Sequence, residues 1–172
     1  MNALSQTALP YFESLERRQA LVTEAQSWLG TPFRPHAGVK GAGADCVGLV
    51  HGILHNIGAI GEVTFPDYTM DGGSHLTASQ LGEFIISLGW FTEVKFGVVE
   101  TGDLVTFKLG RVAHHVGLAV SQAAFIHVYR GMCAGEATLA DPTWKTRLTA
   151  VYRLLDQSSR ITDHASRITS HP

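Results

Sequence analysis

The spacing of apolar residues changes once along this 172-residue chain, close to Gly89. Before that point, apolar residues recur every three or four positions, which is the spacing of a helix with one buried face. After it, apolar and polar residues alternate, which is the spacing of a strand with one buried face. Helices followed by an antiparallel sheet are the order of an α+β domain. The sequence therefore predicts the α+β fold class.

Helices and strands can be placed from the same pattern. The helices are predicted at residues 17–29, 45–57 and 77–88, and the strands at residues 104–108, 115–121, 125–129 and 147–154. The short gap between the second and third strands favours a hairpin. In the second helix, Gly48 and Gly52 share one face, although a glycine inside a helix costs about 1 kcal/mol. We therefore expect this face to approach another backbone closely.

The chain is long enough for one domain with a buried core. We assign residues 1–15 to an N-terminal arm, residues 16–155 to the domain and residues 156–172 to a flexible polar tail. A net charge of −2 without a cluster of Lys or Arg argues against a nucleic-acid groove. No apolar run approaches the length of about 20 residues that a membrane helix requires, so no membrane span is expected.

The first residues lack the basic start and apolar core of a secretory signal. We therefore expect synthesis in the cytoplasm without a signal peptide. The chain has two cysteines, Cys46 and Cys133. They are too few for a disulfide framework, and their spacing from the histidines does not match a structural zinc site. No metal is expected.

Cys46 begins the second predicted helix, and Asp45 stands in the N-cap position. The N–H groups and the positive dipole end at a helix N-terminus favour thiolate over thiol, which lowers a cysteine pKa. The same N–H groups can hold an oxyanion during acyl transfer. Cys46 is therefore a candidate nucleophile, with a buried structural cysteine as the alternative.

A nucleophilic thiolate needs a base, and the base needs a residue that orients it. His115 opens the second predicted strand, on a face where Gly117 and Ala119 leave room for a helix or a substrate. His127 lies 12 residues later on the returning strand, so both rings can project from one face if the turn preserves the alternation. His127 would then fix the tautomer of His115. His114 points to the opposite face by alternation and is the weaker candidate for the base.

These residues belong to short motifs that occur in the order WLGTPF, GADCVGLV with Cys46, TGDLVTF, HHVGLAV with His115, and FIHVYR with His127. Over residues 17–155, this order resembles the NlpC-type cysteine peptidases. The resemblance implies a papain-like α+β core, in which the helix of the nucleophile packs on the antiparallel sheet. It implies Cys46 as nucleophile, His115 as base and His127 as orienting residue, without a metal or cofactor. The implied substrate is the peptidoglycan stem peptide, whose amide bonds these enzymes cleave, often next to D-glutamate.

The stretches TPFRPHAGVKGAGADCVGLV and TWKTRLTAVYRL look most like the branch of this family that tailed phages, prophages and gene transfer agents encode. That likeness implies a peptidase associated with a phage-like tail or particle, with tail proteins as partners and the cell wall as its place of action. Two alternatives stay open. One is an inactive structural tail protein on the same fold, and the other is an amidase or acyltransferase with a substrate outside the wall.

Four residues near the nucleophile are candidates for substrate binding: Asp45, Phe33, His36 and Val47. The family often has Ser after the cysteine, where this chain has Val47. That Ser, with the preceding Asp, helps to bind a free N-terminal amine in cell-wall recycling members. The family also often has Tyr where this chain has Phe33, and the Tyr hydroxyl is thought to lie near the nucleophile. Because Phe33 cannot donate a hydrogen bond, His36 or a backbone N–H is the expected substitute.

Overall fold

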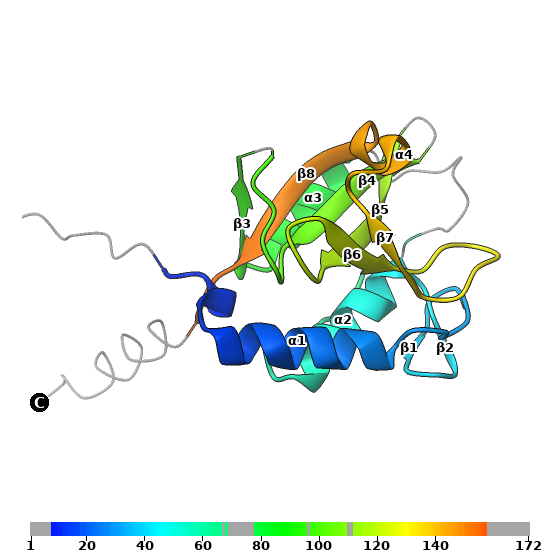
Figure 1. Ribbon diagram of the computed structural model, residues 1–172, viewed down its shortest axis with the longest axis horizontal. Helices are drawn as coiled ribbons and strands as arrows, with labels where there is room; N and C mark the ends of the chain where they lie inside the picture. Colours follow the sequence, from blue (N-terminus) through cyan, green and yellow to red (C-terminus); the bar gives the residue numbers. More distant parts are fainter. Residues whose placement is uncertain (1–7, 67, 69–77, 96, 110–111, 158–172) are drawn as a thin grey trace, which may run out of the picture.

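The computed structural model describes residues 8–66, 68, 78–95, 97–109 and 112–157 (Figure 1). The helices are the 3-10 helix η1 (Tyr11–Glu13) and the α-helices α1 (Leu15–Ser27), α2 (Cys46–Asn56), α3 (Ala78–Ser87) and α4 (Pro142–Lys145). The strands are β1 (Gly38–Val39), β2 (Gly43–Ala44), β3 (Phe91–Val94), β4 (Leu104–Leu109), β5 (Val112–Ala119), β6 (Ala124–His127), β7 (Gly135–Thr138) and β8 (Leu148–Leu154). Each predicted helix and strand is present, with ends that shift by at most three residues.

Strands β3 to β8 form one antiparallel sheet in the order β3-β8-β4-β5-β6-β7, and β1 pairs with β2 in the loop before α2. Helices α1 and α2 lie side by side next to this sheet, and α3 contacts β3, β5 and β8 (Figure 1). The arrangement confirms the predicted α+β fold with α2 packed on an antiparallel sheet. Strands β3 and β7 and helix α4 were beyond prediction, because elements this short show too few repeats of either spacing.

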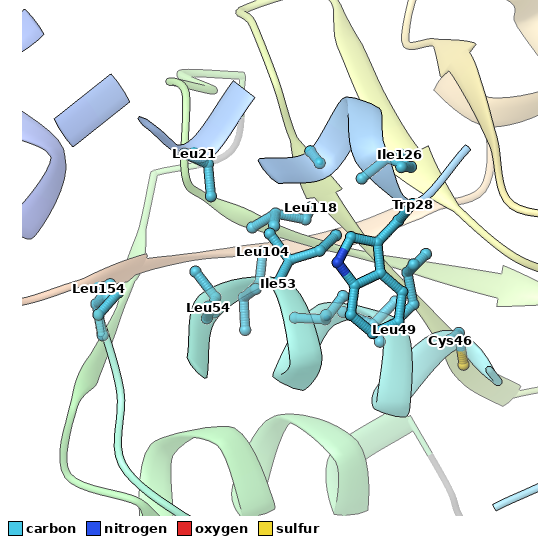
Figure 2. Packing of buried hydrophobic residues seen from close by; sticks show 14 of the residues in the cluster. Leu21, Trp28, Cys46, Leu49, Ile53, Leu54, Leu104, Leu118, Ile126 and Leu154 are labelled. Carbon is cyan, nitrogen blue, oxygen red and sulfur yellow. The ribbon is translucent and has the colours of Figure 1, made fainter. Parts of the chain in front are cut away.

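The main core forms where α2 meets the sheet. Leu49, Ile53 and Leu54 of α2 have no exposed surface, and they belong to one cluster with Leu118 of β5 and Ile126 of β6 (Figure 2). Burying side chains of this kind stabilises a fold by about 1.5–3 kcal/mol each. The helix that carries Cys46 is therefore held to the strands that carry the two histidines.

The two glycines of α2 allow close approach, but to different partners. A Cβ at Gly48 would meet the carbonyl oxygen of Ala37 and would lie 2.9 Å from the Cα atom of Gly38. A Cβ at Gly52 would instead meet the indole ring of Trp28. The expected contact with another backbone is therefore confirmed for Gly48. It is wrong for Gly52, where an aromatic side chain fills the space.

The sheet carries a different cluster of side chains on each face. Val116 and Leu118 of β5 belong to the main cluster with α2. The second cluster consists of Val99, Val105, Phe107, Ala119, Phe125 and Val151. The expectation that the small residues of β5 leave room for a helix or a substrate is wrong, because the ring of Phe125 covers Gly117. A Cβ at Gly117 would lie only 2.5 Å from the Cδ2 atom of Phe125.

Part of the N-terminal arm packs against the domain. Pro10 forms an isolated β-bridge with Leu155. Phe12 is buried, and its ring fills the space next to Gly102 that a side chain there would need. Residues 1–7 of the arm and residues 158–172 of the tail lie outside the described residues. No helix in the described part of the chain is both long and apolar enough to cross a membrane.

Replacing Gly48 by Ala is expected to lower the free energy of unfolding by about 2 kcal/mol, because the methyl group would collide with backbone atoms. Gly61→Ala is the matched control, since Gly61 is exposed and has no atom within 4 Å of its Cβ position. That control should change the free energy by less than about 1 kcal/mol. Urea unfolding measures both values, and equal changes would contradict the close contact between α2 and the loop before it.

Candidate active site

Cys46 is the first residue of α2, and 6% of its surface is exposed. The helix begins here because the Oδ1 atom of Asp45 accepts the N–H of Gly48 at 2.8 Å. This bond confirms the predicted N-cap. Figure 2 shows the sulfur of Cys46 at the N-terminal end of α2, with Leu49 and Ile53 further along the helix.

The carboxylate of Asp45 also holds residues outside α2. Asp45 has no exposed surface. Its Oδ2 atom accepts the backbone N–H of His36 at 2.7 Å and the hydroxyl of Tyr68 at 2.7 Å. The N–H of Asp45 donates to the carbonyl of Ala37 at 3.0 Å. Asp45 therefore joins the helix start, the loop before it and Tyr68.

The residues around position 33 lie between two neighbouring segments. The N–H of Phe33 donates to the carbonyl of Met132 at 3.1 Å, and the N–H of Arg34 donates to the carbonyl of Ala44 at 3.0 Å. Phe33 is half-buried and packs against the main core cluster, whereas Met132 is exposed. The backbone at Phe33 therefore lies beside Ala44, two residues before the cysteine.

His115 and His127 form a buried pair. The Nε2 atom of His115 lies 3.1 Å from the Nδ1 atom of His127, which is a hydrogen-bonding distance. Only 2% of His115 and 6% of His127 is exposed. The pairing of Ala119 with Phe125 sets a register that preserves the alternation across the turn. Both rings therefore project from one face, and they meet as diagonal neighbours on adjacent strands.

Aromatic side chains surround the two imidazoles. The ring centre of Trp144 lies 4.7 Å from that of His127 and 5.8 Å from that of His115. Phe107 and Phe125 contact the same pair, with centre distances of 6.0 Å to His115 and 5.2 Å to His127, respectively. Trp144 reaches this position because Asp141 caps α4 through the N–H of Thr143 at 2.7 Å. The imidazoles therefore lie on the face of the second cluster.

The backbone of β5 connects the cysteine to the histidine pair. The sulfur of Cys46 accepts a hydrogen bond from the N–H of Val116, the residue that follows His115. The N–H groups of Val47 and of Cys46 itself also point to the sulfur. A buried thiol at a helix N-terminus therefore lies at β5, the strand that carries His115 of the buried imidazole pair.

Comparison with known proteins places this arrangement in a family. Residues 30–153 match the model of the NlpC/P60 family. The chain belongs to the NlpC/P60 family. It is 24% identical over 152 residues to the Escherichia coli K12 protein named murein DD-endopeptidase MepS/murein LD-carboxypeptidase, covering 86% of this chain and 70% of that protein.

Solved structures show the same papain-like fold. An NLP/P60 family protein of Staphylococcus aureus described as similar to lipoprotein matches with a TM-score of 0.59 and 19% identity, covering 86% of this chain and 44% of that one. An NlpC/P60 family protein of Bacillus cereus matches with a TM-score of 0.58 and 22% identity, covering 81% and 40%. The NlpC/p60 domain of the peptidoglycan hydrolase SagA matches with a TM-score of 0.52 and 18% identity, covering 78% and 96%. The match therefore spans less than half the length of the first two proteins.

Burial sets the protonation state of the cysteine in this NlpC/P60 domain. Burial is the largest effect, and it raises the pKa of the Cys46 thiol to about 12. The charge of Asp45 also raises this pKa, whereas the hydrogen bond from the Val116 N–H lowers it. The prediction of a lowered pKa at the helix N-terminus is therefore wrong for the resting protein. Loss of water around the sulfur outweighs the favourable N–H groups. At neutral pH, Cys46 is a neutral thiol.

The residues predicted to bind substrate occupy different positions in the NlpC/P60 domain. Asp45 is buried and Val47 is half-buried against the main core cluster. His36 is exposed, with a φ of 55° that is uncommon for a residue other than glycine. Its ring centre lies 4.6 Å from that of Tyr68. The structure thus brings Asp45 and His36 together with Tyr68, which the sequence analysis did not single out.

Two further residues bear on the choice of nucleophile and base. Cys133 is exposed and unpaired, in contrast to the buried Cys46. His114 lies at an irregularity of β5, where Phe107 pairs with His115 and Lys108 pairs with Ala113. Among the described residues, no group of three His, Cys, Asp or Glu side chains is arranged to hold a metal ion.

The buried His127 should make stability fall in acid. Burial lowers the pKa of His127 from 6.5 to about 4. Between pH 6.5 and pH 4, the imidazole is therefore protonated in the unfolded chain but not in the folded chain. Stability is therefore fully present above pH 6.5 and is lost as the pH falls towards 4, by up to about 3 kcal/mol. Urea unfolding at several pH values should show the advantage of the wild type over His127→Gln shrinking across this window. A constant difference would contradict the lowered pKa.

Proposed function

We propose that this chain is a cysteine peptidase that hydrolyses amide bonds in the stem peptides of peptidoglycan, with Cys46 as nucleophile, His115 as base and His127 as orienting residue. The observation that carries the proposal is the buried His115–His127 pair, whose Nε2 and Nδ1 atoms are 3.1 Å apart, together with the contact between the Cys46 sulfur and the backbone of Val116, the residue after His115 on β5. The names of two similar proteins, a murein endopeptidase and a peptidoglycan hydrolase, support the substrate.

The two imidazoles have different roles in the proposed proton transfer. His127 is neutral at pH 7, because burial lowers its pKa to about 4. Its Nδ1 atom can therefore accept the Nε2–H of His115. In that tautomer, the Nδ1 atom of His115 carries the lone pair that takes the proton of Cys46. This assignment makes His127 the residue that selects the reactive tautomer, as the third member of a triad does.

The proposed reaction starts from the neutral thiol of Cys46. As the thiol of Cys46 attacks the scissile carbonyl, its proton moves to His115, and the carbonyl oxygen becomes an oxyanion. N–H groups at the start of α2 can stabilise that charge. The amine then leaves with the proton from His115, and an acyl-enzyme remains on the sulfur. Water deprotonated by His115 hydrolyses this thioester and restores the free thiol.

Four variants test these assignments. Cys46→Ala and His115→Ala are expected to abolish the release of fragments from purified peptidoglycan, because each removes a group that reacts. Cys133→Ala and His114→Ala are the matched controls and should retain it. Mass spectrometry of the digested muropeptides measures the outcome. Equal cleavage by the wild type and Cys46→Ala would contradict Cys46 as the nucleophile. Loss of cleavage in His114→Ala but not in His115→Ala would identify His114 as the base instead.

We also propose that the protein works in a phage-like tail or particle, which carries it from the cytoplasm to the cell wall. The support is the likeness of the segment around Cys46 and of the closing segment of the domain to the phage and gene-transfer-agent branch. Mass spectrometry of particles purified from a producing strain should then find this chain in a fixed ratio to the tail proteins. Its absence from such particles would contradict the proposed route.

A further inference from the structure

Tyr68 places a phenol against Asp45, the residue before the proposed nucleophile. Its hydroxyl donates to the Oδ2 atom of Asp45 at 2.7 Å, and its ring stacks at a tilt on His36. Burial raises the pKa of Tyr68 well above its ordinary value, and the charges of Asp45 and of a Cys46 thiolate raise it further. The phenol therefore stays protonated and remains a hydrogen-bond donor to the carboxylate of Asp45.

The charge of Asp45 opposes the formation of a second negative charge on Cys46. Asp45 has no exposed surface, so water does not screen this charge. Its carboxylate has three donors in the described part of the chain: the N–H of Gly48, the N–H of His36 and the hydroxyl of Tyr68. The first two come from the backbone, and Tyr68 supplies the side-chain donor. A hydrogen bond to a buried carboxylate disperses its charge and stabilises its ionised form.

We propose that Tyr68 is a positioning residue for the Cys46 nucleophile, which acts by donating its hydroxyl to the buried carboxylate of Asp45. The bond weakens the field that Asp45 exerts on the sulfur, and it fixes the carboxylate that begins α2. Among the described residues, the titratable groups that act on the thiol are Asp45 at the helix start and Tyr68 from the segment after α2, and His115 and His127 stand on the neighbouring strands β5 and β6. Calling Cys46 a nucleophile rests on the proposed function, whereas the effect of Tyr68 on its thiol does not.

Tyr68 also changes the interpretation of Phe33. Phe33 cannot supply a hydroxyl, and the sequence suggests His36 or a backbone N–H as the substitute. In the structure, the N–H of His36 is bonded to Asp45 and its ring contacts Tyr68. A hydroxyl next to Asp45 is thus supplied by Tyr68, which follows α2 in the sequence. The ring of His36 packs against the ring of Tyr68.

The test is the rate at which iodoacetamide alkylates Cys46, followed by peptide mass spectrometry at neutral and mildly alkaline pH. Tyr68→Phe keeps the ring on His36 and removes only the hydroxyl. It is expected to slow alkylation of Cys46 by about tenfold, which corresponds to one unit of thiol pKa, and to move the pH profile upward. Exposed Cys133 in the same sample is the internal reference and should react at an unchanged rate. Tyr11→Phe, which removes a hydroxyl from η1, should leave the rate at Cys46 unchanged.

A second background separates this role from a purely structural one. Asp45→Asn keeps a side chain that can cap α2 but removes the charge. In that background, alkylation of Cys46 should be faster, and adding Tyr68→Phe should slow it no further. An unchanged or faster reaction in Tyr68→Phe alone, or an equal slowing in both backgrounds, would overturn the proposal. These rates need no wall substrate, so failure of the proposed peptidase activity would be seen separately.

Discussion

The rest of the site depends on the hydrogen bonds that the buried carboxylate of Asp45 accepts. This carboxylate begins α2 by accepting the N–H of Gly48, and it holds the loop through His36 and the segment after the helix through Tyr68. A buried carboxylate without donors costs several kcal/mol. The three donors therefore stabilise the carboxylate that caps the helix carrying Cys46. One buried side chain thus links the start of α2, the loop before it and the segment after it.

Burial determines how such a site can be reactive. It makes separate charges on Cys46 and on His127 unfavourable, which keeps these two groups neutral at rest. In a medium of low dielectric, two opposite charges attract each other far more strongly than in water. In the proposed mechanism, moving a proton from the thiol to an imidazole creates both charges together. The transfer would therefore cost less than forming the two charges separately.

Local patterns were enough to predict α2, the β5–β6 hairpin and the pairing of the two imidazole rings. Each depends on residues close in sequence: Asp45 next to Cys46, and two strands joined by a short turn. Tyr68, Trp144 and the ion pair between Asp103 and Arg153 could not be predicted in this way. Asp103 looks like an ordinary turn residue, yet it is buried and accepts two bonds from Arg153, at 2.9 and 2.8 Å. Such contacts join residues whose separation in sequence carries no periodic signal.

The two halves of the site belong to different clusters of side chains. Cys46 lies in the main cluster with α2, whereas the imidazoles lie among the aromatic rings on the other face of the sheet. The backbone of β5 at Val116 links the two, so a small shift of α2 along the strand would move the thiol away from the proposed base without unfolding either cluster. Two close contacts of α2, Gly48 on the preceding loop and Gly52 on Trp28, leave no space for that shift. Glycines that weaken the helix by their conformational freedom therefore hold Cys46 in place.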